Sequence, residues 1–340
     1  MKKTVLLTGV TGFLGSHTTI KLLEKGYRVI GTLRNMDRAQ AIRSVIEKHT
    51  RNIDSLDFAE AHLEDESVWD KLIQKVDFVQ HIASPFPREL PKHENDLVLP
   101  AKAGTLNIVK AAARNGVKRV VITSSVGAIV YGKPKHQRNG TFTEAHWTDV
   151  ANKQDSTPYF RSKTLAEKAA WEFIKKDTSG LELSVVCPGA ILGPVLEKDF
   201  GTSANLVIKT MDGSSPALPD LGFDIVDVRS VADLLILAME KPGAAGERFI
   251  ATAGYMKFKE IAQVVKSAYP EKKIPTGSLP DFVVKLYSNI DKTLKPVLID
   301  LGVSRKTGSS KAKDVLHWEP LSNREAVLSC AQSVIDLKLV

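Results

Sequence analysis

The sequence predicts an α/β protein with a doubly wound parallel sheet and a smaller C-terminal lobe. Two observations carry this prediction. From Thr4 to Cys187 short apolar segments alternate with amphipathic helical patterns, which is typical of parallel strands joined by helices. A glycine-rich turn joins the first apolar segment to the first helical pattern. After Gly189 this rhythm is lost, and residues 190–224 carry several Gly and Pro without a clear period.

The glycine turn has the spacing of a dinucleotide-binding motif, with Gly9, Gly12 and Gly15 between a strand and a helix. We expect the first glycine to make the sharp turn and the second to let a pyrophosphate approach the backbone. The third would let the helix pack close to the strand. The helix N-terminus then faces the phosphates. Spacing alone leaves an ordinary tight turn as an alternative. A signal peptide is disfavoured, because the apolar run is short and charged residues follow soon after it.

The remaining elements follow in order. Five further strands are expected at 27–33, 56–60, 76–82, 119–123 and 183–187, and helices at 13–25, 96–114 and 158–177. Pro100 predicts a kink or a later start in the second helix, whereas Pro158 suits the first turn of the third. Residues 131–157 are polar and are expected to form a surface excursion. We expect residues 224–228 and the helix 231–239, capped by Asp227 or Ser230, to return to the main sheet. A helix is expected at 257–268, and 270–325 are expected to be irregular with helical patches. The cofactor domain would comprise 1–188 plus about 224–252, and the substrate lobe about 189–223 and 253–340.

Composition limits the class of protein. The chain has 340 residues, of which 43% are hydrophobic and 25% charged, and its net charge is +8. It contains no run of the roughly 20 apolar residues that a membrane span needs. Cys187 and Cys330 are its only cysteines, which favours a reducing compartment, and we expect a cytoplasmic protein. The basic residues are scattered, so a nucleic-acid surface is unsupported, and an anionic cofactor would account for some of the excess charge.

The end of the second strand bears on the choice of cofactor. Sites for NAD place an acidic residue there to hold the ribose 2′-OH, whereas an Arg accommodates the 2′-phosphate of NADP. This chain has Leu33 and then Arg34, with Arg38 four residues later. A guanidinium suits a phosphate in geometry and charge. The alternative is two surface arginines, although a helix start is a poor place for a cation.

A Tyr and a Lys four residues apart could form an acid/base pair on one helix face, because a nearby ammonium favours the tyrosinate. The spacing occurs four times, at Tyr131/Lys135, Tyr159/Lys163, Tyr255/Lys259 and Tyr269/Lys273. Proline or glycine interrupts the first and last pairs. Only the second lies in a strong helical pattern after a strand that ends in Ser124-Ser125. An amphipathic tyrosine beside a solvated lysine remains the alternative for this pair.

These motifs together resemble the extended short-chain dehydrogenases/reductases, in the branch of dihydroflavonol reductases, cinnamoyl-CoA reductases and yeast-type methylglyoxal (aldehyde) reductases. The matching segments are residues 8–15, Arg34, 81–86, 104–107, 123–125, 159–167, 187–189, 193–194, 226–229, 310–313 and 318–320. The resemblance implies a Rossmann fold and an NADPH-dependent reductase of aldehydes or ketones. The sequence departs from the family at His62-Leu63, where related sequences often have Asp-Leu. The hydrogen bond that this Asp usually makes to adenine is therefore in doubt.

The resemblance also implies roles for single residues. Tyr159 would be the general acid, Lys163 would lower its pKa and bind the nicotinamide ribose, and Ser125, 34 residues before the tyrosine, would hold the carbonyl. Pro188 would begin the loop that seats the nicotinamide. The cofactor-binding set would be Thr8, Gly9, Thr11, Gly12, Phe13, Leu14, Gly15, Arg34, Arg38, Leu63, Ala83, Ser84, Thr123, Tyr159, Lys163, Pro188 and Gly189. Positions after strand ends suggest Phe86, Val126, Tyr131, Phe160, Ile191 and Leu192 as pocket linings.

Rival functions remain. A nucleotide-sugar epimerase or dehydratase shares the fold and the Tyr/Lys pair, but it would be expected to carry an acidic residue where Leu33 stands. A hydroxysteroid dehydrogenase is a further alternative. A non-catalytic NADP-sensing protein would keep the glycine turn but would not need Ser125, Tyr159 and Lys163. No metal is expected, the partner would be a small carbonyl compound, and the chain would act as a monomer or homodimer.

Overall fold

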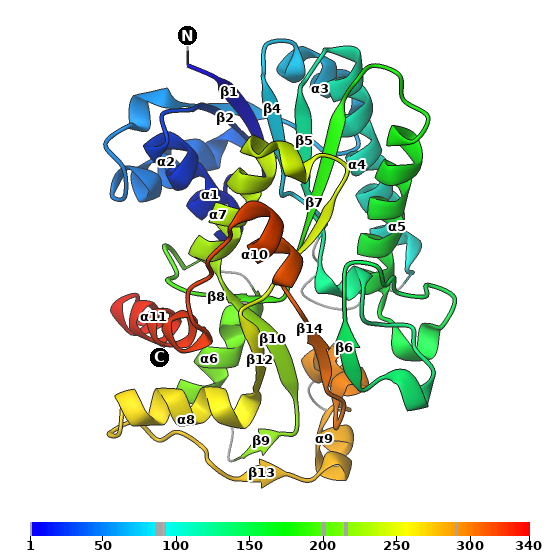
Figure 1. Ribbon diagram of the computed structural model, residues 1–340. Helices are drawn as coiled ribbons and strands as arrows, with labels where there is room; N and C mark the ends of the chain where they lie inside the picture. Colours follow the sequence, from blue (N-terminus) through cyan, green and yellow to red (C-terminus); the bar gives the residue numbers. More distant parts are fainter. Residues whose placement is uncertain (1, 86–90, 92, 199–201, 214–216, 290–291) are drawn as a thin grey trace.

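The computed structural model describes residues 2–85, 91, 93–198, 202–213, 217–289 and 292–340. Its centre is a parallel sheet in the order β11-β7-β5-β4-β1-β2-β3 (Figure 1). This order reverses at β1, as in a doubly wound sheet. The strands are β1 (Thr4–Thr8), β2 (Arg28–Leu33), β3 (Leu56–Glu60), β4 (Phe78–His81), β5 (Arg119–Thr123), β7 (Glu182–Pro188) and β11 (Arg248–Ala251).

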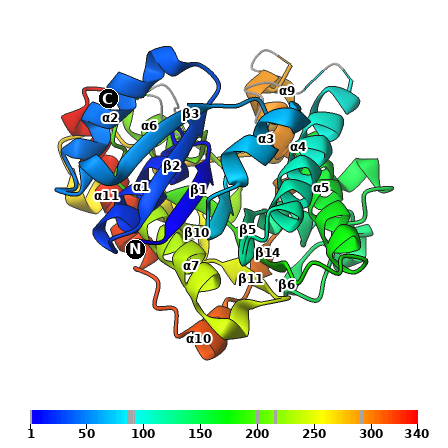
Figure 2. The same ribbon diagram turned by 90° about the horizontal axis from the view of Figure 1, so that it is seen from above.

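Helices cover both faces of this sheet (Figure 2). One hydrophobic cluster joins the sheet to α1 (Phe13–Glu24), α2 (Ala39–Glu47), α7 (Val228–Glu240) and α10 (Ser310–Leu316). A second cluster lies on the opposite face, under α3 (Glu66–Ile73), α4 (Asn95–Arg114) and α5 (Pro158–Ile174). The central strands are buried on both faces, which explains why they are almost continuously apolar in the sequence.

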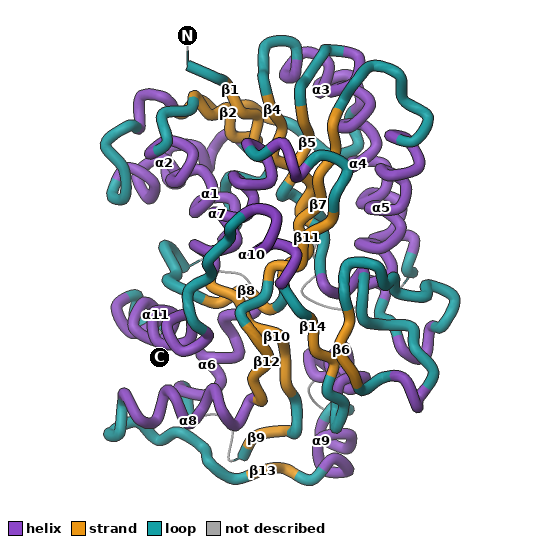
Figure 3. The backbone as a smooth tube through the Cα atoms, viewed as in Figure 1, coloured by secondary structure: helices purple, strands orange, loops and turns teal. Residues whose placement is uncertain are grey.

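A smaller lobe lies beyond the carboxyl ends of the strands (Figure 3). Its three-stranded sheet has the order β12-β10-β8, and its helices at 205–211, 258–268 and 323–336 share a third hydrophobic cluster. Two further strand pairs, β13 with β9 and β14 with β6, complete it. The elements are β6 (Gly140–Phe142), β8 (Ala190–Leu192), α6 (Asn205–Met211), β9 (Leu218–Pro219), β10 (Gly222–Asp227), β12 (Gly254–Lys257), α8 (Phe258–Ala268), β13 (Ser278–Leu279), α9 (Asp281–Tyr287), β14 (Arg305–Thr307) and α11 (Asn323–Asp336).

The fold confirms the doubly wound sheet and corrects three local expectations. The strand near 224 does not return to the main sheet: β10 pairs with β8 and β12, and β11 takes the seventh place beside β7. Of the two alternatives expected at Pro100, a kink or a later start, the later start is wrong, because α4 runs from Asn95 with Pro100 inside it. The excursion after Tyr131 is not only surface, since Tyr131, Thr148 and Asp155 are buried.

Local capping signals explain several helix starts. Asp227 caps α7, because its carboxylate accepts the backbone N–H of Arg229. Of the two residues expected as the cap, Asp227 and Ser230, the first is therefore confirmed. Helix α11 was not expected from the sequence. It begins with a capping box in which Ser322 and Glu325 accept each other's backbone N–H, and this Ser-x-x-Glu pattern is the signal that could have located it. Within the described residues, no helix is long and apolar enough to cross a membrane.

Candidate active site

The predicted functional residues come together at one edge of the sheet. Strands β1, β4, β5 and β7 are parallel and neighbours, so their carboxyl ends lie side by side. The segments that follow them hold the glycine turn, Ala83-Ser84, Ser124-Ser125 and Pro188-Gly189 respectively. Open α/β sheets bind ligands at this edge. The tertiary structure therefore gathers four sequence-distant motifs at one edge of the sheet.

The glycine turn fits a pyrophosphate. Gly9 has a φ of +77°, and a Cβ there would lie 3.1 Å from the Ala83 Cα. A Cβ on Gly15 would lie 2.0 Å from the Gly9 carbonyl oxygen, so the helix can start here only with glycine. Gly12 precedes α1 without a side-chain cap, and the first turn has no acidic residue. The N–H groups of that turn are thus left for an anionic ligand.

Thr8 ties the start of the glycine turn to the end of β4. Its hydroxyl lies 2.9 Å from Nδ1 of His81 and accepts the N–H groups of Ile82 and Ala83 at 3.1 and 3.0 Å. Thr8 is fully buried, and Leu14 is 7% exposed. These two of the expected cofactor-binding residues therefore shape the turn from within the protein. Thr11 and Phe13 are half-buried and Gly12 is exposed at its surface.

The residues expected near the adenosine part of the cofactor differ in their surroundings. Arg34 is exposed directly after β2. Arg38 donates to the Glu197 carboxylate at 3.2 Å, so it is already engaged by an acidic side chain. His62 is exposed, while Leu63 is half-buried and packs against Gly104, where an added Cβ would lie 2.7 Å from the leucine Cβ. Of the two arginines, Arg34 is the freer to meet a phosphate.

Ser125, Tyr159 and Lys163 lie together at the start of α5 and the end of β5. The Thr157 hydroxyl caps α5, Pro158 occupies its first turn, and Tyr159 follows. The Tyr159 hydroxyl is hydrogen-bonded to Ser125. Lys163, one turn later, is buried and donates to the Thr123 carbonyl at 3.0 Å. A proton donor, a second hydroxyl and a cation thus share one small site.

Burial controls the protonation of this group. It raises the pKa of Tyr159 above its usual value, and the hydrogen bond with Ser125 opposes this. The lowering of the Tyr159 pKa that was expected from Lys163 is not seen, because burial and the bond with Ser125 account for the shift. Burial also lowers the pKa of Lys163 to about 8, against the attraction of Cys187 and Glu167. Tyr159 accordingly keeps its proton near neutral pH, as a general acid requires.

A buried cluster behind this site was not expected from the sequence. Glu167, one turn after Lys163, accepts from the Ser124 hydroxyl at 2.6 Å and from Arg248 Nε at 2.5 Å. Trp171 Nε1 donates to the same carboxylate at 3.2 Å. The cluster joins α5 to the end of β5 and to β11. The helical spacing from Lys163 to Glu167 was visible in the sequence, but Arg248 is 81 residues away from Glu167, and no local signal links them.

The tyrosine hydroxyls of the other three Tyr/Lys pairs are hydrogen-bonded in other parts of the protein. The hydroxyl of Tyr131 donates to Asp300 at 2.9 Å, that of Tyr255 to the Val303 carbonyl at 3.3 Å, and that of Tyr269 to Gln332 at 3.0 Å. Tyr131 and Lys135 do not share a regular helix, because Lys135 begins the short 3-10 helix Lys135–Gln137. Tyr159 thus differs from the other three in its bond to the serine at the sheet edge.

The six residues suggested as pocket linings do not form one set. Phe86 lies outside the described residues. Val126 is half-buried beside Ser125, and Phe160 is stacked on Tyr131 with ring centroids 3.9 Å apart. Tyr131 itself is buried with its hydroxyl bound. Ile191 is half-buried, but Leu192 is fully buried in the core of the smaller lobe, where packing occupies its side chain.

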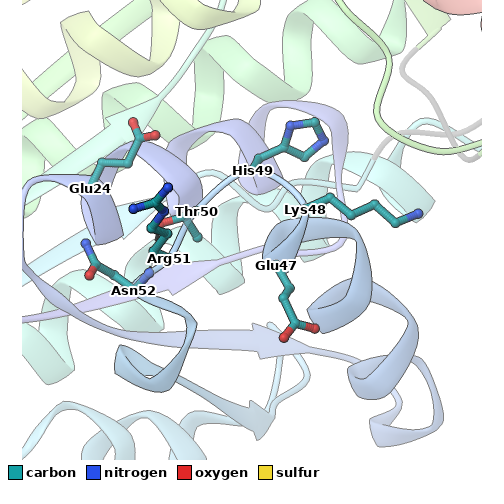
Figure 4. A pocket seen from close by; sticks show the side chains of 7 residues that line it. All are labelled: Glu24, Glu47, Lys48, His49, Thr50, Arg51 and Asn52. Atoms are coloured by element: carbon teal, nitrogen blue, oxygen red, sulfur yellow. Dashed lines mark hydrogen bonds between the residues drawn. The ribbon is translucent and has the colours of Figure 1, made fainter.

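A surface hollow of about 490 Å³ lies away from the residues of this sheet edge (Figure 4). It is formed between the carboxyl ends of α1 and α2. Its lining is Glu24, Glu47, Lys48, His49, Thr50, Arg51 and Asn52. The hollow is open, its side chains are mostly exposed and of mixed charge, and it contains none of the residues discussed above. We therefore place the active site at the sheet edge and not in this hollow.

Comparison with known proteins agrees with this geometry. The model of the NAD dependent epimerase/dehydratase family matches residues 5–251. An anthocyanidin reductase of Vitis vinifera is 33% identical over 312 residues, which cover 86% of this chain and 89% of that protein. Cinnamoyl-CoA reductase 1 of Arabidopsis thaliana is 34% identical over 279 residues, covering 81% and 77%.

Solved structures extend the likeness over the whole chain. The yeast methylglyoxal/isovaleraldehyde reductase Gre2 complexed with NADPH has a TM-score of 0.82 and 26% identity, and the match covers 98% of this chain and 99% of that one. A vestitone reductase from alfalfa, with a TM-score of 0.79 and 23% identity, shares the fold. Both the sheet and the smaller lobe are therefore common to this group.

Proposed function

Because the chain belongs to the NAD-dependent epimerase/dehydratase family, we propose that it reduces an aldehyde or ketone to an alcohol with NADPH. Within that family it is an NAD(P)-dependent reductase of the extended short-chain dehydrogenases/reductases. Its branch contains the dihydroflavonol, cinnamoyl-CoA and methylglyoxal reductases. The observation that carries the proposal is the hydrogen bond between Ser125 and Tyr159 at the carboxyl edge of the sheet. It supplies a protonated donor where a carbonyl oxygen would lie.

The protein's part in the reaction is to position the substrate and to move one proton. When bound, the reduced nicotinamide supplies the hydride for the carbonyl carbon. Tyr159 gives its hydroxyl proton to the carbonyl oxygen as the C–H bond forms, so that the product is a neutral alcohol. Ser125 donates a hydrogen bond to the same oxygen and orients it. Lys163 stabilises the resulting tyrosinate by its charge, and the tyrosine then regains a proton from solvent.

The cofactor would lie across the edge of the sheet. We propose that the N–H groups of the first turn of α1 hold the pyrophosphate, that Arg34 meets the 2′-phosphate, and that Pro188-Gly189 seat the nicotinamide. The buried Oγ1 of Thr123 has no hydrogen-bond partner among the described residues, and the carbonyl oxygen of the same residue accepts from Lys163. A polar group of a bound ligand could satisfy this hydroxyl. The residues of the smaller lobe, about 189–223 and 253–340, would close over the substrate.

The substrate class follows from the setting of the site. We propose that the half-buried Val126, Phe160 and Ile191 form an apolar border to it, which would favour an aliphatic or aromatic group next to the carbonyl. The yeast reductase with the similar structure is named for methylglyoxal and isovaleraldehyde, both of which carry an aliphatic group next to the carbonyl. We therefore propose methylglyoxal and isovaleraldehyde as the first substrates to test with NADPH, followed by aromatic aldehydes and ketones.

Substitution of Tyr159 tests the mechanism. Tyr159→Phe removes only the hydroxyl, so NADPH binding and folding should survive while turnover falls by about 10²–10⁴-fold, the usual contribution of general acid catalysis. Tyr255→Phe is the matched control, because that hydroxyl also has a bond, to Val303, but lies in another part of the protein. Near-normal turnover of Tyr159→Phe with NADPH still bound would exclude Tyr159 as the donor.

A further inference from the structure

Strand β14 is only three residues long, yet it reaches both sides of the proposed active site. Arg305 and Thr307 are buried, while Lys306 between them is exposed. The strand pairs in parallel with β6 and also lies against β10 and β12 (Figure 1). It therefore connects the excursion after Tyr131 with the sheet of the smaller lobe. The two buried side chains of β14 bind to different partners.

Arg305 supports the side that carries the proton donor. Its guanidinium makes two hydrogen bonds to Asp155, at 2.6 and 3.2 Å, and one to Asp300 at 3.1 Å. It also lies over the Tyr131 ring, 4.6 Å from the centroid. Asp300 in turn accepts the Tyr131 hydroxyl. Two buried carboxylates and one arginine thus fix the position of the tyrosine ring.

The fixed ring continues to the catalytic residues. Tyr131 is stacked on Phe160, with ring planes 9° apart, and Phe160 directly follows Tyr159. On its other side Phe160 packs against Gly127, where a Cβ would lie 2.4 Å from the ring and 3.2 Å from the Ser125 Oγ. A displacement of the Tyr131 ring would therefore move Phe160, and with it the start of α5 and the serine loop.

Thr307 supports the opposite side. Its hydroxyl donates to Asp224 Oδ2 at 2.8 Å and lies 3.2 Å from the hydroxyl of Thr252. The Asp224 carbonyl oxygen packs directly behind Gly189, where an added Cβ would lie 2.3 Å from it. The position of β10 at Asp224 thus limits the position of the Pro188-Gly189 loop. Burial raises the pKa of Asp224 to about 6, and the Thr307 hydrogen bond opposes this.

We propose that β14 is a positioning strand, in which Arg305 and Thr307 set the separation between the proton donor, Tyr159, and the loop at Gly189 that seats the nicotinamide. The proposal rests on the proposed function, because it assigns the two sides their roles. It adds that their spacing is set by a short strand near the C-terminus, which itself carries no reacting group. Rates of hydride transfer are sensitive to such spacing, and a misplacement of about 1 Å costs on the order of 10²-fold.

Two variants test the two sides separately. Arg305→Lys keeps the charge between the carboxylates but loses the forked geometry of the guanidinium. Thr307→Val keeps the shape and removes one hydroxyl, so it is the milder change. Lys306→Gln is the control within β14. Arg119→Lys is the control for loss of a buried guanidinium, because Arg119 is 1% exposed and donates to Glu182 and to backbone carbonyls at the other end of the sheet.

The measurements are stopped-flow hydride transfer in a single turnover with methylglyoxal or isovaleraldehyde, NADPH affinity, and the fluorescence emission of bound NADPH. We expect both β14 variants to slow hydride transfer by about ten-fold or more with unchanged NADPH affinity. Thr307→Val should also change the emission of the bound nicotinamide, because its surroundings move. Arg305→Lys, which acts on the far side, should not. Lys306→Gln and Arg119→Lys should match the wild type in both readouts.

Wild-type hydride transfer in either Arg305→Lys or Thr307→Val would overturn the proposal, since a spacer needs both ends. Equal slowing in Arg119→Lys would also overturn it, because the effect would then be one of general stability. The Tyr159→Phe variant separates this failure from that of the proposed function. An inactive Tyr159→Phe beside fully active β14 variants rejects the positioning strand alone, whereas an active Tyr159→Phe rejects the assignment of the proton donor.

Discussion

Substitution of Glu167 by Gln should destabilise the protein strongly, because it breaks a buried ion pair. The side chains of Glu167 and Arg248 are 1% and 8% exposed, and they lie 2.5 Å apart. Removing one partner of such a pair leaves a buried charge and typically costs about 3–5 kcal/mol. Arg248 keeps two carbonyl acceptors, Glu144 at 2.6 Å and His146 at 3.1 Å, and its contact with the Trp147 ring. We therefore expect the lower end of that range, about 3 kcal/mol.

The assay is urea denaturation, with the free energy of unfolding compared at an unchanged m-value. Glu182→Gln is the matched control. Glu182 pairs with the buried Arg119 at 2.6 Å but is itself 35% exposed. That arginine retains three backbone acceptors, at Ala238, Met239 and Lys241. Because the lost charge is partly solvated, we expect about 1 kcal/mol or less. If Glu167→Gln loses no more stability than Glu182→Gln, the reasoning from burial is refuted.

The same variant has an effect on the active site. Burial lowers the pKa of Lys163 to about 8, and the charge of Glu167 acts against this. Without that charge the pKa of Lys163 falls further, so the lysine loses its proton at a lower pH. The alkaline limb of the pH dependence of kcat/KM should therefore move to lower pH in Glu167→Gln. An unmoved limb would show that Lys163 does not respond to its neighbour.

Three further predictions concern single side chains. Arg34→Ala should raise the KM for NADPH about ten-fold or more and leave NADH little changed, because a charge-assisted contact with phosphate is worth about 1.5–3 kcal/mol; equal losses with both cofactors would contradict it. Lys163→Ala should lower turnover and also weaken NADPH binding. The affinity for NADPH is measured by fluorescence titration, and an intact affinity would argue against a contact between Lys163 and the ribose. The pKa of Asp224 is raised to about 6 in the folded protein, so its contribution to stability is present below about pH 4 and is lost as the pH rises through 6. Asp224→Asn should remove that decline, at most about 3 kcal/mol, from the pH dependence of unfolding.

The glycine turn and the helix of Tyr159 could be predicted because their signals are local. Gly9 is required by its own φ of +77° and Gly15 by its contact with the Gly9 carbonyl oxygen, and Pro158 with Thr157 marks the start of α5. The expected seventh strand was wrong for the opposite reason. Both β10 and β11 are short and mix apolar with charged residues, and only their partners decide that β11 joins β7 in the main sheet. Strand pairing is a long-range choice that propensity does not specify.

The sequence by itself predicted the doubly wound sheet, the glycine turn and the preference for Tyr159 among four Tyr/Lys pairs, because periodicity and turn chemistry are properties of neighbouring residues. The tertiary structure alone decided how the site is supported. Tyr131, expected in a substrate pocket, is held by Asp300 and Arg305, far along the chain. Buried charges must find partners wherever the fold brings them, so such clusters follow from packing and leave no spacing in the sequence.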